Sequence, residues 1–141
     1  MAEALARERS PESWKGELSF SSAGTYALVG EPASEHAVTA LGEMGIDHTG
    51  HSARQLTREL IEASDLVIVM TGRHRTAVLE LDPSARSRVL VFGELDDARG
   101  SPDIDDPYGG AMADYRKTRD EIEGLTSLLI AYLADRFKLS M

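Results

Sequence analysis

Leu66-Val67-Ile68-Val69-Met70 is the stretch that decides the fold, because it is an unbroken apolar run rich in β-branched residues. Such a run is typical of a strand buried on both faces, as in a parallel sheet. A second apolar run, Val89–Phe92, follows a segment of helical character at residues 73–81. Strands that alternate with helices predict an α/β fold with a parallel sheet, whose ligand sites lie beyond the carboxyl ends of the strands.

Further helices and one further strand are predicted around this centre. Apolar residues recur at helical spacing in several segments, and capping residues mark some of their ends. The expected helices cover residues 2–9, 36–44 (N-cap Ser34, C-cap Gly45), 57–62 (N-cap Thr57) and 114–137, the last with a stripe of Ile122, Leu125, Leu129, Tyr132 and Leu133. Leu18–Ser21 alternates as a strand does, and residues 93–110, dense in Asp, Gly and Pro, predict a loop.

Composition narrows the class of protein. The 141 residues, 42% of them hydrophobic, suit a single domain over residues 1–141. No apolar run approaches the roughly 20 residues of a membrane span, and residues 1–7 do not read as a signal peptide, so a cytoplasmic location is expected. The formal net charge of −9 disfavours nucleic acid and mildly favours cationic protein partners, although it is also ordinary for solubility.

The chain contains no cysteine, which excludes thiol chemistry, disulfides and thiolate metal sites within these residues. His36, His48, His51 and His74 show no paired spacing such as H-x3-H. We therefore expect neither a metal nor a cofactor.

Short motifs spread along the chain carry a family resemblance. They are Met1-Ala2-Glu3-Ala4-Leu5, Ser22-Ala23-Gly24-Thr25, His51-x-Ala53-Arg54-Gln55-Leu56-Thr57, the strand Asp65–Met70 before His74, and Asp106-Pro107-Tyr108. In this order and spacing they resemble the low-molecular-weight protein tyrosine phosphatases, from Met1 to about Phe137. The Asp106–Gly110 stretch, followed by Tyr115–Asp120, resembles the corresponding sequence of a bacterial subgroup that includes protein arginine phosphatases. The resemblance implies a three-layer α/β fold with a small parallel sheet flanked by helices.

In that family a loop of the form C-x5-R-S/T-P comes directly before M-A-E-A-L, so the resemblance places it before Met1. The first central strand, the cysteine nucleophile and the arginine would then be missing from these 141 residues, and we expect them to be inactive. Either the functional protein continues upstream, or this is a non-catalytic relative that binds phosphorylated or cationic partners. Arsenate reductase, which shares the fold, is disfavoured because it needs several cysteines.

The resemblance also assigns roles to residues that are present. Asp106 would be the general acid, although Asp-Pro before Gly-Gly is also ordinary turn chemistry. Tyr108 would line the mouth of the substrate site, and Ser22 and His51 would support the phosphate loop through an asparagine of that loop. The implied substrate is a protein phosphorylated on tyrosine or arginine. A homodimer stays open.

Overall fold

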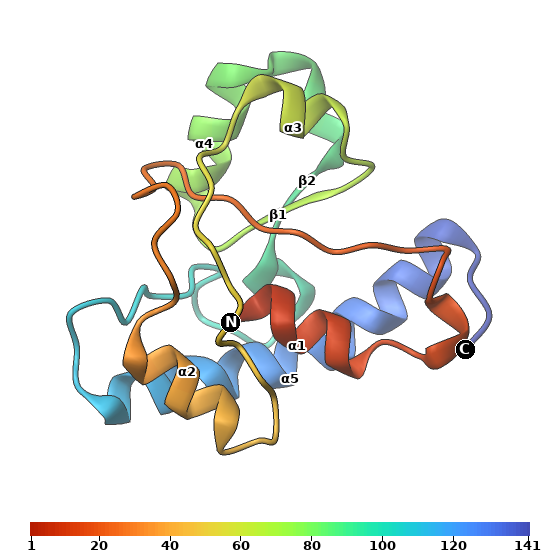
Figure 1. Ribbon diagram of the computed structural model, residues 1–141. Helices are drawn as coiled ribbons and strands as arrows, with labels where there is room; N and C mark the ends of the chain where they lie inside the picture. The colour runs from red at the N-terminus through yellow and green to blue at the C-terminus, as the bar shows by residue number, and fades with distance from the viewer. The chain divides into compact units, whose positions relative to one another are not determined.

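The computed structural model describes all residues from Met1 to Met141, and the chain forms two compact units (Figure 1). The unit that we call the helical unit comprises Met1–Ser22, Pro32–His51 and Asp106–Met141. The sheet unit comprises Ala23–Glu31 and Ser52–Asp105. Each unit draws on separated stretches of sequence, so its core depends on tertiary contacts.

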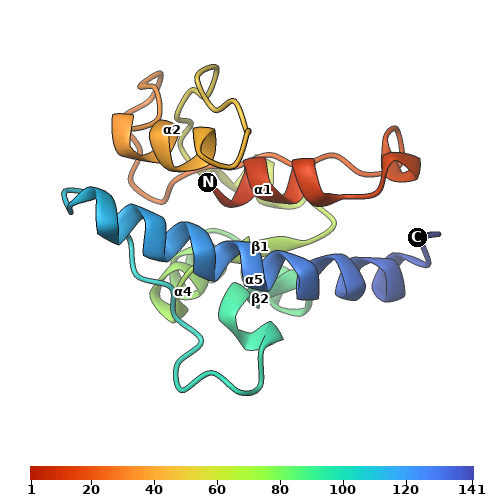
Figure 2. The ribbon, with the colours of Figure 1, turned by 90° about the horizontal axis from the view of Figure 1, so that it is seen from below.

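The helical unit is built on one long helix. Helix α5 (Met112–Phe137) packs against α1 (Ala2–Arg9) and α2 (Glu35–Gly42), and a 3-10 turn, η1 (Glu12–Trp14), follows α1 (Figure 2). The predicted stripe of α5 is buried at Ile122, Leu125, Leu129 and Leu133. Tyr132, the remaining residue of the stripe, is half-buried. No helix in the chain has both the length and the apolarity needed to cross a membrane.

Helix ends follow the local chemistry of the sequence. The Ser34 side chain accepts a hydrogen bond from the Ala37 amide at 3.2 Å, and Thr57 accepts one from the Leu60 amide at 3.3 Å, so both predicted N-caps are confirmed. The C-cap of α2 is Glu43, not Gly45. Gly45 instead takes a left-handed φ of +78° in the turn that follows, where a residue without Cβ is favoured.

The sheet unit contains the predicted parallel sheet. Strands β1 (Val67–Val69) and β2 (Val89–Val91) pair in register, Val67 with Val89. Around them lie the remaining elements of this unit, α3 (Arg58–Glu62), α4 (Gly72–Leu81) and the 3-10 segments η2 (Pro83–Arg88) and η3 (Phe92–Leu95). The α/β class is thereby confirmed. The expected burial of both strand faces is not, because the sheet has two strands and Val67, Ile68, Val89 and Leu90 are half-buried.

The core of the sheet unit joins helices and strands. Buried Val69 and Val91 pack with Ile61 of α3, Val78 of α4 and Ala85 of η2. Residues from the predicted helices and from the two apolar runs therefore form one apolar cluster. That cluster holds β1 and β2 together.

Leu18–Ser21 is not a strand, contrary to the prediction. The segment makes only an isolated bridge, between Lys15 and Leu18, and no ladder with another strand. The Phe20 carbonyl instead accepts a hydrogen bond from Arg7 Nη2 at 2.7 Å. Alternation gives a strand its two faces, but a strand also needs a neighbouring backbone with which to pair.

Candidate functional site

The predicted general acid lies on a well-defined turn of the helical unit, which we call the acid loop (Asp106–Ala111). The Gly110 amide donates to the Pro107 carbonyl at 2.8 Å, and Gly109 has a φ of +81°. A left-handed residue at the third position identifies a type II turn, which glycine favours there. The Asp106 Oδ1 atom accepts a hydrogen bond from the Tyr108 amide at 3.0 Å. Local chemistry therefore shapes this turn, as the Asp-Pro-Tyr-Gly-Gly sequence predicts.

Both candidate residues of the acid loop are accessible. Asp106 is exposed, and Tyr108 is 77% exposed. Because Asp106 Oδ1 already accepts the Tyr108 amide, Oδ2 is the oxygen better able to carry a transferable proton. An exposed carboxyl beside an exposed aromatic ring can serve a ligand that approaches from solvent.

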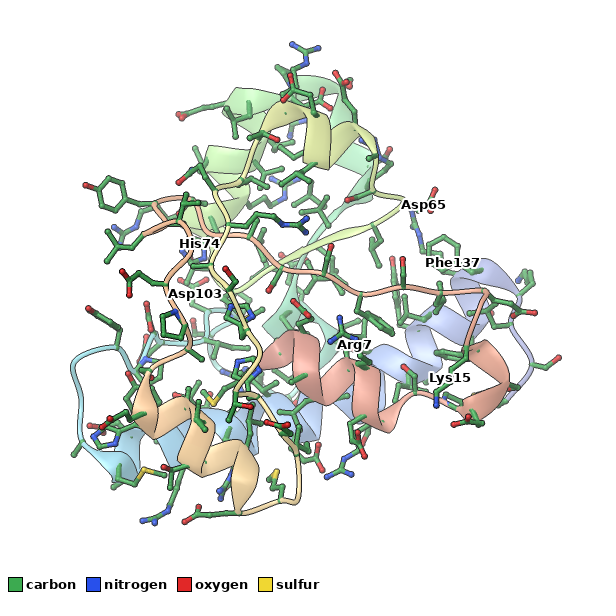
Figure 3. All side chains as sticks on the ribbon, viewed as in Figure 1. Arg7, Lys15, Asp65, His74, Asp103 and Phe137 are labelled. Carbon is green, nitrogen blue, oxygen red and sulfur yellow. The ribbon has the colours of Figure 1, made fainter.

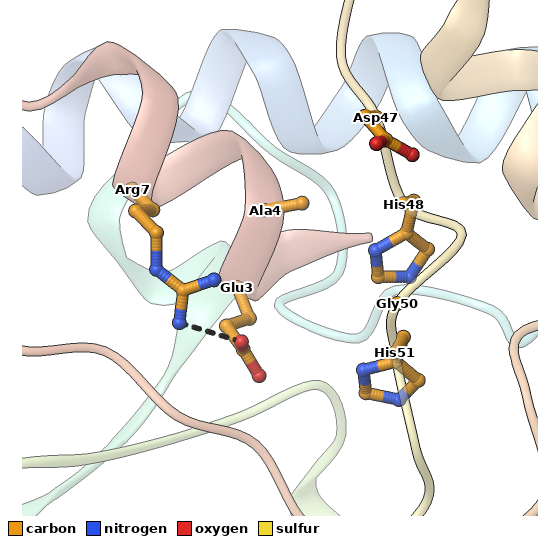
Figure 4. Close-up of a pocket in the computed structure, with 7 residues that line it drawn as sticks. All are labelled: Glu3, Ala4, Arg7, Asp47, His48, Gly50 and His51. Carbon is orange, nitrogen blue, oxygen red and sulfur yellow. Dashed lines mark hydrogen bonds and ion pairs between the residues drawn. The ribbon is translucent and has the colours of Figure 1, made fainter.

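Ser22 and His51 meet around Glu3. A hollow of about 330 Å³ in the helical unit is lined by Glu3, Ala4, Arg7, Asp47, His48, Gly50 and His51 (Figure 4). Ser22 Oγ donates to Glu3 Oε1 at 2.5 Å. Arg7, labelled in Figures 3 and 4, donates from Nη2 to Glu3 Oε2 at 2.7 Å, the contact dashed in Figure 4. Asp106 and Tyr108 do not line this hollow. Ser22 therefore supports the first turn of α1 through Glu3.

The electrostatics of the hollow keep Glu3 charged and His48 neutral. Burial opposes ionisation of Glu3, but hydrogen bonds from Ser22 and Arg7 outweigh it and lower the pKa of that carboxyl. Burial is also the main cause that lowers the pKa of His48 to about 4, followed by the positive charges of the Met1 amine and His51. The two imidazole rings stack with centroids 4.8 Å apart. His48 is thus an uncharged packing partner of His51.

Sequence reasoning missed Glu3, Arg7, Asp47 and His48. Glu3 and Arg7 stand four residues apart on α1, a spacing that predicts an ion pair, and this signal was available in the sequence. The contact of Ser22 with Glu3 was not, because the two residues are 19 apart in the chain. No group of three or more His, Cys, Asp or Glu side chains is arranged to hold a metal ion.

Two of the quoted motifs are joined by hydrogen bonds within the sheet unit. The Gly24 amide donates to the Arg54 carbonyl at 2.9 Å, and the Leu56 amide donates to the Gly24 carbonyl at 2.8 Å. The Gln55 side chain also donates to the Thr25 carbonyl, at 2.9 Å. The residues of the second motif therefore hold the turn formed by the first.

Arg73, His74 and Arg75 form a small basic cluster in the first turn of α4, where the His74 amide donates to the side chain of the N-cap Thr71 at 3.1 Å. The carboxylate of Asp103 accepts the Gly72 amide at 2.9 Å, so an acidic side chain of the unit already occupies this helix end. The cluster is thus part of a capped helix start.

Comparison with known proteins agrees with the motifs. A family model for low molecular weight phosphotyrosine protein phosphatase matches residues 1–138. A probable low molecular weight protein-tyrosine-phosphatase, EpsP, of Ralstonia solanacearum is 39% identical over 112 residues, which cover 79% of this chain and 71% of that protein. A protein-arginine-phosphatase of Bacillus subtilis is 38% identical over 113 residues, covering 79% and 73%.

The fold agrees as well. The structure of the YwlE arginine phosphatase from Geobacillus stearothermophilus superimposes with a TM-score of 0.85 at 30% identity, covering 99% of this chain and 88% of that one. The match extends over the acid loop, the two joined motifs and the first helix. The chain therefore belongs to the low molecular weight phosphotyrosine protein phosphatase family.

Proposed function

We propose that this chain is the scaffold and general-acid part of a phosphatase that removes phosphoryl groups from tyrosine or arginine of phosphorylated proteins. We propose further that the 141 residues alone do not turn over substrate. The observation that carries the first proposal is Asp106 on an exposed, hydrogen-bonded turn in a chain of this family. The second rests on the lack of any cysteine.

The proposed reaction divides between residues that are present and a thiol that is not. A thiolate attacks phosphorus, the bond from phosphorus to the leaving atom breaks, and Asp106 gives its proton to that atom. Water then hydrolyses the cysteinyl phosphate, with the Asp106 carboxylate taking its proton. Tyr108 would line the substrate mouth, while Ser22 and His51 would support the phosphate loop. The thiol and the arginine would come from a C-x5-R-S/T-P segment.

The test compares two proteins. The first is the 141-residue chain. The second carries, in frame before Met1, the first strand and C-x5-R-S-P loop of a family member. We expect p-nitrophenyl phosphate hydrolysis only from the second, lost on Cys→Ser in the added loop. We expect Asp106→Asn to lower the rate by about 10²-fold or more. Turnover by the 141-residue chain, or none by a folded extended chain, would contradict the proposal.

A second candidate function follows from the same absence of thiol. The chain would bind phosphorylated proteins without turning them over, with exposed Tyr108 as one contact. Titration with a phosphotyrosine peptide and its unphosphorylated form, in the wild type and in Tyr108→Ala, separates the two candidates. Binding of the phosphorylated form alone, weakened by the substitution, supports a binding role. A cytoplasmic location and a homodimer stay predictions, which cell fractionation and sedimentation velocity would check.

A further inference from the structure

A second carboxylate holds the far end of the acid loop. Asp114, in the first turn of α5, accepts a hydrogen bond from the Ala111 amide through Oδ2 at 2.9 Å. Ala111 is the N-cap of α5 and has no side-chain oxygen, so Asp114 provides the side-chain hydrogen bond at this helix start. The Asp114 side chain therefore fixes the point at which the acid loop joins α5.

The same carboxylate packs against the turn itself. A Cβ added to Gly110 would lie 2.7 Å from Asp114 Oδ2 and 2.9 Å from the Pro107 carbonyl oxygen. Gly110 thus fits between the helix start and the turn only because it lacks a side chain. Asp114, Gly110 and Pro107 form one close-packed group, and Asp106 precedes it directly.

The base of this group is anchored to α2. Arg119 Nη1 donates to the Ala40 carbonyl at 2.9 Å and to Glu43 Oε1 at 2.7 Å, and Arg116 Nη2 donates to Glu43 Oε2 at 2.7 Å. Tyr115, next to Asp114, is buried against Ala37 and Ala40. The first two turns of α5 are therefore a fixed platform for the Asp114 carboxylate.

From these contacts we infer that Asp114 is a positioning residue for Asp106. Asp106 fixes the near end of the turn through the Tyr108 amide, and Asp114 fixes the far end through the Ala111 amide. Loss of the Asp114 acceptor frees the far end, so that the Asp106 carboxyl samples a wider range of positions. The effect of the Asp114 contact on catalysis rests on the proposed function, but its effect on the order of the loop does not.

The ordering is tested on the 141-residue chain by amide order parameters and hydrogen exchange at residues 108–111. In Asp114→Ala we expect these amides to become mobile and to exchange roughly fivefold faster, with the centre of α5 unchanged. Asp114→Asn keeps an acceptor oxygen and should retain the wild-type values. Asp135→Ala, an exposed acid at the other end of α5, is the matched control. An unchanged loop in Asp114→Ala would overturn the inference.

A second measurement, on the extended chain described above, tests whether the Asp114 contact affects catalysis. A weakened general acid slows a substrate with a poor leaving group, such as phenyl phosphate, more than p-nitrophenyl phosphate. We expect Asp114→Ala to lower kcat/KM, which reports the step that expels the leaving group, several-fold more for the first substrate than for the second, and Asp114→Asn to restore the ratio. Equal losses on both substrates would contradict positioning of the acid. Failure of the extended chain to turn over would contradict the proposed function and leave the loop test standing.

Discussion

The indole Nε1 of Trp14 donates a hydrogen bond to the backbone carbonyl of Ser140 at 2.6 Å, across 126 residues of sequence. Trp14 is 1% exposed and is the only tryptophan of the chain. Its ring supplies apolar packing, and its single donor ties η1 to the segment that follows α5. This contact therefore closes the helical unit at the end of α5.

Trp14→Phe should separate these two contributions. Phenylalanine keeps most of the apolar surface but removes the donor, so we expect a loss of about 0.5–1.5 kcal/mol in the free energy of unfolding. Trp14→Ala also leaves a cavity and should cost about 3–5 kcal/mol. Urea unfolding followed by circular dichroism measures both. Equal losses in the two variants would show that the hydrogen bond, not the packing, dominates.

Glu43 gives a prediction for acid pH. Hydrogen bonds from Arg116 and Arg119 lower its pKa to about 2. A carboxyl whose folded-state pKa lies below its unfolded value of about 4.5 stabilises the fold above that value, and the contribution is lost as pH falls towards 2. Glu43→Gln should therefore remove part of the acid destabilisation between about pH 4.5 and pH 2. Thermal unfolding across this range tests the prediction, with exposed Glu62→Gln as a comparison. If Glu43→Gln loses as much stability as the wild type between pH 4.5 and pH 2, the ion network is contradicted.

His48 gives a prediction at higher pH. Its folded-state pKa of about 4 lies below the usual 6.5, so the unfolded chain takes up a proton first as the solution is acidified. The contribution of His48 to the free energy of unfolding should be fully present above about pH 6.5 and should be lost as the pH falls from 6.5 to 4. His48→Leu should reduce the loss of stability between pH 6.5 and pH 4, whereas the exposed control His36→Leu should not. An NMR titration midpoint of His48 near 6.5 would show that the ring is not desolvated.

Gly93 should not tolerate a side chain. A Cβ there would lie 2.1 Å from the carbonyl oxygen of Pro102, a backbone atom that cannot move aside easily. We expect Gly93→Ala to destabilise the sheet unit by about 1–3 kcal/mol or more. Gly100→Ala is the matched control, because its Cβ would meet nothing within 4 Å. Denaturant unfolding of both variants measures the difference, and equal stability would mean that the loop relaxes freely.

Much of the fold was predictable because it is encoded locally. The runs Leu66–Met70 and Val89–Phe92 contain the two strands, because apolar, β-branched runs have few alternatives. Ser34 and Thr57 cap helices through hydrogen bonds that span three residues. Leu18–Ser21 shows the limit of this reasoning. Its alternation is equally local, but a strand depends on a neighbour that no pattern within the segment reveals.

The candidate site also combines features that the local sequence sets with features that depend on tertiary contacts. The sequence by itself determined the family, the acid loop and the place of Asp106 in it, because five short motifs in order along the chain and a five-residue turn carry that information. Only the tertiary structure decided that Ser22 meets Glu3, that His48 is desolvated, and that Asp114 is anchored through Arg116 and Arg119 to α2. The physical reason is that burial and ion pairing depend on groups that are distant in the chain, and folding alone brings these together.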